Sequence, residues 1–252
     1  MPQSAPRLDI HGHQATVTLR RPKLANRLDP EDLETLLAHL EKVNATAAVR
    51  VLLLQAEGRH FCSGFNIKAA SGVDAGALFE RLSNAWAEAR PVTVAAIQGG
   101  VYGGATDLAL ACDFRLGTPA CEMFVPAARL GLHFYRGGME RYVSRLGVSA
   151  AKRVLLGCET LDAQAMLGCG FLDRLLPDAE ALHQECQALC SRLGSLAPLA
   201  LLPMKKHLNA MAEGRLAVDA LQADIARANA SADLAEGLRA WEEKRLPRFV
   251  GR

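Results

Sequence analysis

Aromatic side chains and long apolar runs are both scarce in this chain. Phe, Trp and Tyr make up 5% of its 252 residues. No apolar run approaches the roughly 20 residues that a membrane-spanning helix needs. The first ten residues have neither the apolar core of a signal peptide nor the Arg-rich amphipathic pattern of an organelle transit sequence. These absences predict a cytoplasmic protein that makes no contact with a membrane.

The sequence also lacks any dense block of charge and any metal-binding spacing. Its formal net charge is +2, with acidic and basic residues interspersed, so nothing favours nucleic acid as a partner. Seven cysteines, an odd number without an export signal, indicate reduced thiols. Cys186 and Cys190 do not follow a zinc-binding spacing, and neither do His11 and His13, so we expect no metal site.

The stretch from Val92 to Asp113 carries the strongest local signal. An apolar run, Val92 to Ile97, has the length and β-branching of a buried strand, and a turn with four glycines follows it. The next segment, with Asp107 in its first turn, is predicted to be helical. Glycines at such a turn let the backbone approach a ligand, and the free N–H groups of the helix start attract negative charge. A tight turn that only packs the helix closely is the alternative.

The bound anion need not be a phosphate. The glycine spacing does not fit a phosphate-binding loop, and it fits the dinucleotide fingerprint only loosely. An oxygen that becomes negative during a reaction, such as that of a thioester enolate, is the other common ligand of such amides.

The front of the chain is rich in strand signals and the back is helical, which indicates an α/β core with a helical C-terminal region. Asp29 and Pro30 are typical of the start of a helix. Helices without a sheet of their own pack on the core or on another subunit, so we expect an oligomer. The expected strands are 8–10, 15–19, 49–55, 92–97, 114–116 and 122–124, and the expected helices are 30–44, 74–89, 137–145, 179–193, 199–212, 216–229 and 231–244.

Several motifs in order along the chain resemble those of the crotonase, or enoyl-CoA hydratase/isomerase, superfamily. Each is weak alone, but the ordered set is specific and covers essentially the whole chain. The motifs are Arg21-Pro22-Lys23, the loop from Phe61 to Lys68, the central strand with its Gly-Gly turn, Cys112-Asp113, Pro126, Leu130-Gly131, Gly137-Gly138 and the closing segment from Trp241 to Phe249.

The resemblance implies an α/β fold, a spiral of ββα units in residues 1–195, followed by a helical oligomerisation region in residues 196–252. Family members form trimers, which are usually paired into hexamers. The implied partner is an acyl-CoA thioester, with coenzyme A as part of the substrate and no separate cofactor. By position, the backbone amides of Phe65 and Gly104 would form the oxyanion hole. The implied CoA- and substrate-binding residues are Lys23, Leu24, Ala25, Asn66, Ile67, Lys68, Trp241 and Lys244.

The acid/base residues depart from the family pattern. The standard hydratase has two glutamates, and here their positions hold Asp107 and Ala127. Aspartate is shorter by about one C–C bond, ~1.5 Å, and alanine carries no acid group. Tyr135 stands where some relatives place a catalytic aspartate, and His133 precedes it by two residues. Both are candidate proton-transfer groups, and both would otherwise form walls of the acyl pocket. Asp107 would otherwise cap its helix.

The sequence therefore predicts an enzyme that stabilises a thioester enolate but is not a standard two-glutamate hydratase. Isomerisation, unusual hydration or dehydration, and decarboxylation all remain open. The alternative is a catalytically degenerate protein that binds acyl-CoA or serves as a scaffold, because Ala127 lacks the second carboxylate.

Overall fold

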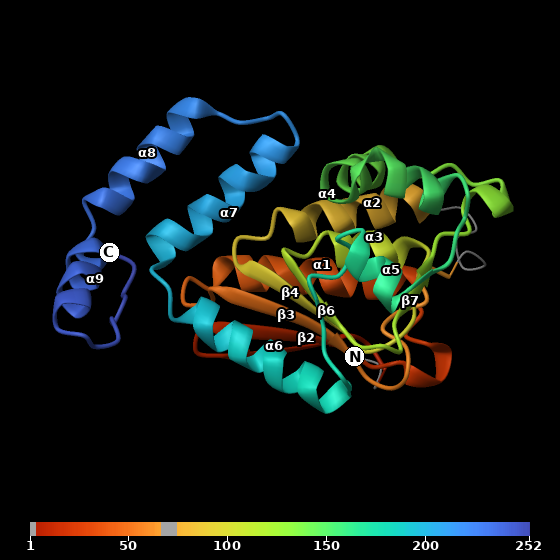
Figure 1. Cartoon of the computed structure of the whole chain (residues 1–252), viewed down its shortest axis with the longest axis horizontal. Coiled ribbons are helices and arrows are strands. Elements are labelled where there is room, and N and C mark those ends of the chain that lie inside the picture. The colour runs from red at the N-terminus through yellow and green to blue at the C-terminus, as the bar shows by residue number, and fades with distance from the viewer. Residues whose placement is uncertain (1–3, 67–74) are drawn as a thin grey trace.

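The structure is a computed structural model that describes residues 4–66 and 75–252. Its largest feature is a six-stranded sheet in the order β1-β2-β3-β4-β6-β9, and Figure 1 labels the inner strands β2, β3, β4 and β6. β1 and β2 form an antiparallel hairpin, and the other neighbours are parallel. The strands are β1 (Arg7–His11), β2 (Gln14–Leu19), β3 (Val51–Ala56), β4 (Val92–Ile97), β6 (Phe114–Gly117) and β9 (Arg174–Leu175). The predicted α/β core is confirmed.

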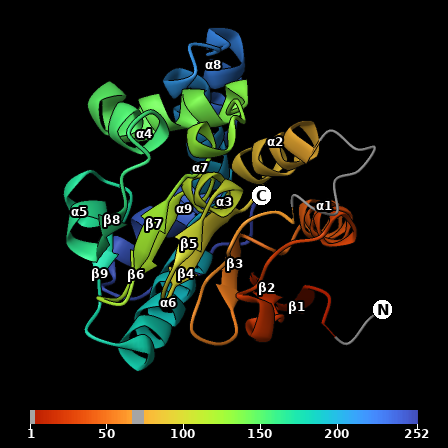
Figure 2. The same ribbon diagram turned by 90° about the vertical axis from the view of Figure 1, so that its right-hand side faces the viewer.

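Helices cover both faces of this sheet because alternate residues of each buried strand point to opposite sides. On β3, Val51 and Leu53 join the apolar cluster formed with α6 (Ala179–Gly194). Leu52 and Leu54 belong to the larger cluster on the other face, with α1 (Pro30–Ala45), α2 (Ala75–Ala87) and α3 (Gly104–Leu110). Figure 2 shows α6 on one side of the sheet and α1, α2 and α3 on the other.

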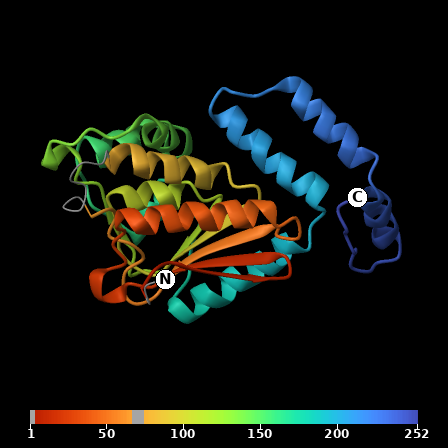
Figure 3. The same cartoon turned by 180° about the vertical axis from the view of Figure 1, so that it is seen from behind.

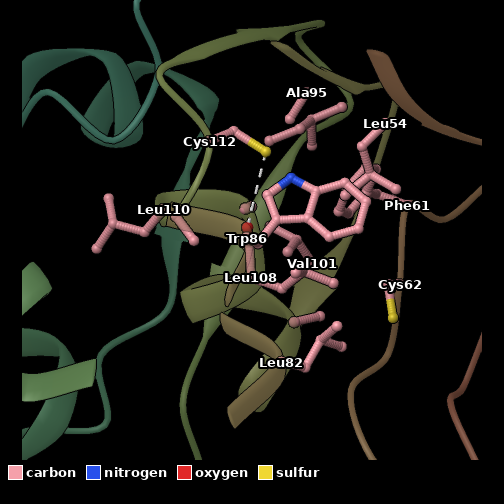
Figure 4. Close-up of a cluster of buried hydrophobic side chains, with 14 of the residues drawn as sticks. Leu54, Phe61, Cys62, Leu82, Trp86, Ala95, Val101, Leu108, Leu110 and Cys112 are labelled. Carbon is pink, nitrogen blue, oxygen red and sulfur yellow. Dashed lines mark hydrogen bonds between the residues drawn. The ribbon is translucent and has the colours of Figure 1, made fainter. Parts of the chain in front are cut away.

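Trp86 lies at the centre of the larger cluster. Figure 4 shows its indole ring among side chains from β3, β4 and α3, with Phe61 beside it. Trp86 and Phe61 are both fully buried. A buried aromatic residue of this size removes much apolar surface from water, so this cluster fixes α2 and α3 against the sheet, and α3 carries the candidate site.

The predicted start of α1 is confirmed. Asp29 is the N-cap, Pro30 occupies the first turn, and the side chains and backbones of Asp29 and Asp32 form a reciprocal capping box. Leu33, Leu36 and Leu40 lie on the buried face, as the spacing predicts. The signals were local, which is why the sequence located this helix within a residue of its observed ends.

A second, three-stranded sheet lies beside the first and was only partly predicted. It has the order β5-β7-β8, from β5 (Val101–Tyr102), β7 (Glu122–Phe124) and β8 (Leu161–Asp162). β5 falls inside the segment predicted to be a glycine turn. The sequence also gave no signal for α5 (Ala163–Gly168) or β9. These short elements depend on partners that are distant in the chain.

The helix predicted to begin at Gly137-Gly138 is longer than expected. α4 spans Arg136–Leu155 and contains a break at Gly147, where φ is 78° and ψ is 159°. Residues of non-glycine type rarely adopt this region. The first part of α4 packs on α2 and α3, which brings its side chains to the candidate site.

The C-terminal helices extend away from the core, as Figures 1 and 3 show. They are α7 (Pro198–Ala212), α8 (Val218–Asn229) and α9 (Ala232–Glu242), all close to the predicted ranges. Two buried cations tie this region to the sheet: Lys205 donates to Pro91 O at 2.7 Å, and Arg50 donates to Phe249 O at 2.8 Å. The suggested boundary after residue 195 falls between α6 and α7, and the division into two domains stays a prediction.

Among residues 4–66 and 75–252, no helix is long and apolar enough to cross a membrane. The same residues contain no group of three or more His, Cys, Asp or Glu placed to hold a metal ion.

Candidate active site

Phe65 lies in a loop held on both sides by hydrogen bonds. On one side, Leu28 N donates to Gly64 O and Asn66 N donates to Leu28 O, both at 2.9 Å. In a parallel bridge of this kind the N–H of the intervening residue, Phe65, points away from the partner strand. On the other side, Tyr102 N donates to Cys62 O at 3.0 Å. The loop is thus bonded directly to β5, the strand that leads into α3.

Gly104 is the first residue of α3, so its N–H has no acceptor within the helix. Gly103 before it has a φ of 56° and donates to Phe124 O at 3.0 Å, which fixes the turn. Gly64 approaches this turn closely: a Cβ on Gly64 would lie 2.7 Å from Tyr102 O and 3.4 Å from Gly104 N. Among the hydrogen bonds of the described residues, neither the Phe65 N–H nor the Gly104 N–H has an acceptor.

Two aromatic rings stand beside these amides. A Cβ on Gly104 would lie 3.0 Å from the ring of Phe79 in α2, so this ring covers the start of α3. Phe79 is 2% exposed, and the ring of Phe65 meets it edge-on with centroids 6.5 Å apart. Phe79 therefore leaves no room for a side chain at the first position of α3.

Asp107 lies one turn after Gly104 and is bound by Arg141 of α4 and by Tyr135, the N-cap residue of α4. Its Oδ1 accepts from Arg141 Nε at 2.8 Å, and its Oδ2 accepts from Arg141 Nη2 at 2.7 Å and from Tyr135 Oη at 2.8 Å. Arg141 Nη1 donates to Asn84 Oδ1 of α2 at 2.7 Å. The Asp107 side chain is 0% exposed. It does not cap α3, which was the alternative from the sequence.

The electrostatics keep both neighbours of Asp107 protonated. Burial raises the pKa of Tyr135 well above its ordinary value, and the charge and hydrogen bond of Asp107 raise it further. Burial alone would lower the pKa of Arg141, but the hydrogen bonds and charge of Asp107 outweigh it and leave that pKa raised. Burial also raises the pKa of Tyr142, whose hydroxyl donates to Thr106 Oγ1 at 2.6 Å. The site therefore consists of a buried ion pair between Asp107 and Arg141, with the neutral phenol of Tyr135 hydrogen-bonded to the carboxylate.

The other acid/base candidates are placed differently. His133 is exposed, and its Nδ1 lies 2.7 Å from Phe134 O. Ala127 is partly buried and packs on the main core, without a polar atom in its side chain. Of the sequence candidates, the structure therefore brings Tyr135 into contact with Asp107, whereas His133 contacts its neighbour in the chain, Phe134.

The residues expected to bind CoA fall into separate groups. Lys23 and Leu24, in η1 (Pro22–Leu24), are exposed, and Ala25 caps this turn with a φ of 49°. Asn66 donates from Nδ2 to Asp29 Oδ1 at 2.8 Å. Ile67 and Lys68 lie outside the described residues.

Trp241 and Lys244, the remaining expected CoA contacts, belong to the exposed C-terminal end of the chain. Trp241 in α9 is 86% exposed, and Lys244 just after that helix is exposed too. α9 lies far from α3 in the single chain, as Figures 1 and 3 both show. The roles of all the expected CoA-binding residues stay predictions.

Comparison with known proteins decides the family. The sequence profile of the Enoyl-CoA hydratase/isomerase family matches residues 10–252. The chain belongs to this family. An enoyl-CoA isomerase/hydratase of Mycosarcoma maydis is 32% identical over 212 residues, which cover 81% of this chain and 77% of that protein. The 2,3-dehydroadipyl-CoA hydratase of Escherichia coli is 28% identical over 247 residues, or 94% of each chain.

Solved structures of the enoyl-CoA hydratase/isomerase family share this fold. An enoyl-CoA hydratase from Bacillus anthracis superposes with a TM-score of 0.89 at 25% identity, covering 98% of this chain and 99% of that one. An enoyl-CoA hydratase/carnithine racemase from Magnetospirillum magneticum gives a TM-score of 0.92 at 25% identity, covering 98% and 96%. The predicted crotonase fold with its helical C-terminal region is confirmed.

Sequence reasoning missed three residues of this site. They are Arg141, Asn84 and Phe79, to which the sequence assigns no role. Asp107 and Arg141 are 34 positions apart, and Asn84 and Arg141 are 57 apart. Nothing local in the sequence connects residues at such separations, so only the packing of α2, α3 and α4 reveals the contacts.

Proposed function

We propose that this chain acts on an acyl-CoA thioester and stabilises its enolate with the backbone amides of Phe65 and Gly104. The observation that carries the proposal is the pair of N–H groups left without acceptors in one hydrogen-bonded network, with Gly64 packed against the Gly104 turn. A donor of this kind contributes about 3 kcal/mol of transition-state stabilisation because it is already oriented toward the developing charge.

The single carboxylate favours double-bond isomerisation over hydration. In a 1,3-proton shift, one base removes a proton from one carbon of the acyl chain and returns it to another, and the electron pair resides meanwhile on the enolate. No water enters the balance. Hydration needs an activated water as well, and Ala127 has no acid or base to help position it. Asp107, with Tyr135 on its Oδ2, is the proposed proton carrier.

The test is turnover of a panel of acyl-CoA thioesters that includes enoyl-CoA isomers with the double bond at different positions. We expect the double bond to move into or out of conjugation, with a matching change in enone absorbance. Asp107→Asn should abolish this change, and Tyr135→Phe should reduce it. His133→Gln measures the part played by the third candidate, and its exposed position predicts less than about a threefold loss. No turnover with any thioester would contradict the proposal.

A second candidate function is acyl-CoA binding without chemistry. The full burial of Asp107 favours it, because a substrate reaches the open acceptor position of Oδ1 only after a packed neighbour moves aside. Calorimetry would then show acyl-CoA binding that Asp107→Asn leaves unchanged, with no product from any thioester.

We also propose that the chain works as a homotrimer, or as a hexamer of two trimers, in which Trp241 and Lys244 contact CoA bound to a neighbour. Large apolar side chains lie exposed along the C-terminal helices, among them Met204, Leu208, Ile225, Leu238 and Trp241. An apolar surface of this extent favours burial against another subunit. Light scattering of the intact protein gives the subunit number.

A further inference from the structure

Arg141 reaches Asp107 from α4 while it is itself held by α2. Its Nε and Nη2 form a side-on pair with the two carboxylate oxygens, and its Nη1 donates to Asn84 Oδ1. Both ends of the pair are buried, at 5% exposure for Arg141 and 0% for Asp107. In this geometry the guanidinium can neither rotate nor leave without breaking three hydrogen bonds, so the carboxylate has one fixed orientation.

The bonds divide unequally between the two oxygens of Asp107. Oδ2 accepts from Arg141 and from Tyr135, whereas Oδ1 accepts from Arg141 alone. Each carboxylate oxygen offers about two acceptor positions, so Oδ2 is saturated and Oδ1 has one position left.

We infer that Arg141, oriented by Asn84, is the positioning residue of the site: it keeps Asp107 ionised and leaves Oδ1 as the atom that receives the substrate proton. This inference rests on the proposed function, and it identifies Oδ1 of Asp107 as the atom that acts as the base. The C–H bond of the acyl chain breaks, its electron pair passes to the thioester oxygen, and the proton forms an O–H bond with Oδ1. The reverse transfer to another carbon of the chain restores the carboxylate.

Other titratable groups around the pair lie in or beside three elements. Tyr135, the N-cap residue of α4, bonds to Asp107, and Tyr142 within α4 is close enough for Asp107 to raise its pKa. From α2, Glu80 accepts from Gly137 N at 2.7 Å at the start of α4. The charge of Glu213, which follows α7, raises the pKa of Arg141. Arg141 is the group in direct contact that carries a positive charge.

Arg145 supplies a matched control on the same helix. It is one turn further along α4, and it too binds α3 and the residues after it, donating to Cys112 O at 2.6 Å and to Leu110 O. It binds backbone carbonyls, and no carboxylate is among its hydrogen bonds in the described part of the chain. Loss of either arginine removes hydrogen bonds that α4 makes to α3 or to the residues after it, but only loss of Arg141 leaves Asp107 without its cation.

The experiment compares Arg141→Gln, Arg141→Lys and Arg145→Gln by the pH dependence of kcat and by acyl-CoA affinity. A buried carboxylate without its cation favours the protonated form. We therefore expect the acid limb of the Arg141→Gln profile to move up by about 1–3 pH units, with kcat reduced and Kd within about threefold of wild type. Arg141→Lys, which keeps the charge, should restore the limb, and Arg145→Gln should leave it in place.

The same variants separate failure of this inference from failure of the proposed function. If the wild type turns over and the limbs of Arg141→Gln and Arg145→Gln coincide, Arg141 is a structural residue and the inference is overturned. If no thioester turns over, the proposed function is overturned. The infrared spectrum of the carboxyl groups then tests separately whether Arg141 keeps Asp107 ionised. A protonated-carboxyl band that appears in Arg141→Gln and disappears in the Asp107→Asn double variant supports the ionising role of Arg141. Absence of that band overturns it.

Discussion

Gly64 lies so close to Tyr102 that no side chain fits between them. A Cβ on Gly64 would come within 2.7 Å of Tyr102 O, and the φ of Gly64 is +86°, a region that L-residues with side chains rarely adopt. The contact joins the loop that carries the Phe65 amide to the turn that carries the Gly104 amide. The spacing of the proposed oxyanion hole therefore depends on the absence of one side chain.

Gly64→Ala should push the two amides apart. A displacement near 1 Å at a catalytic group costs about a hundredfold in rate, so we expect kcat to fall by roughly 10–100-fold, with a smaller rise in KM. Gly168→Ala is the matched control, because a Cβ there meets nothing within 4 Å and no positive φ opposes it. Steady-state kinetics of both variants make the comparison. Equal kcat values would show that the amides do not act together.

Asn66→Asp should loosen the loop that carries Phe65. Asn66 Nδ2 donates to Asp29 Oδ1 at 2.8 Å, and an aspartate would place two carboxylates at that distance without a donor between them. We expect a lower Tm and weaker acyl-CoA binding. Adding Asp29→Asn returns a donor to the pair and should recover part of both losses in a double-mutant cycle. Additive losses would mean that the contact does not hold the loop.

Phe79→Leu should widen the space beside Gly104 and shift the preference toward longer acyl chains. Each methylene newly buried improves affinity by about fourfold, so the gain should grow along a series of acyl-CoA chain lengths. Phe171→Leu is the control for lost packing, since Phe171 is fully buried in the main core. Calorimetry gives the Kd values. An unchanged order of affinities in Phe79→Leu would place the acyl chain elsewhere.

Stability should fall at alkaline pH because buried thiols resist ionisation. Burial raises the pKa of Cys62, Cys112, Cys186 and Cys190 from 9.0 to about 12. Between those two pKa values, the unfolded chain releases thiol protons that the folded chain retains. The free energy of unfolding therefore keeps its maximum below pH 9 and declines as the pH rises toward 12. Urea unfolding at several pH values measures the slope, and Cys190→Ala should make it shallower. A free energy of unfolding that stays constant over this pH range would contradict the raised pKa values of the thiols.

The sequence predicted most where the signals are local. The Asp29-Pro30 cap and the apolar run at Val92 to Ile97 each specify an element by themselves, and the structure has both. β8 and β9, by contrast, are two residues long and exist through pairing with β7 and β6. Their residues carry no periodic pattern, because a pattern needs more than two positions.

The same contrast applies to the site. Glycines at the end of a strand indicated Gly104 as an anion-binding position, and the place of Asp107 in the next helix made it a candidate catalytic residue. The state of that carboxylate was not predictable, because Arg141 of α4 and Tyr135, the N-cap residue of α4, lie 34 and 28 positions after Asp107. A sequence gives the type and order of such groups, whereas the packing of α4 on α3 determines which of them share a hydrogen bond.

The most direct test of the two-amide account is the infrared spectrum of an enoyl-CoA labelled with ¹³C at its thioester carbonyl and bound to the protein. Two backbone donors on one oxygen polarise the carbonyl, so its stretching band should move to lower frequency on binding and move back part of the way in Gly64→Ala. A band that stays at its solution frequency in a saturated complex would contradict the account.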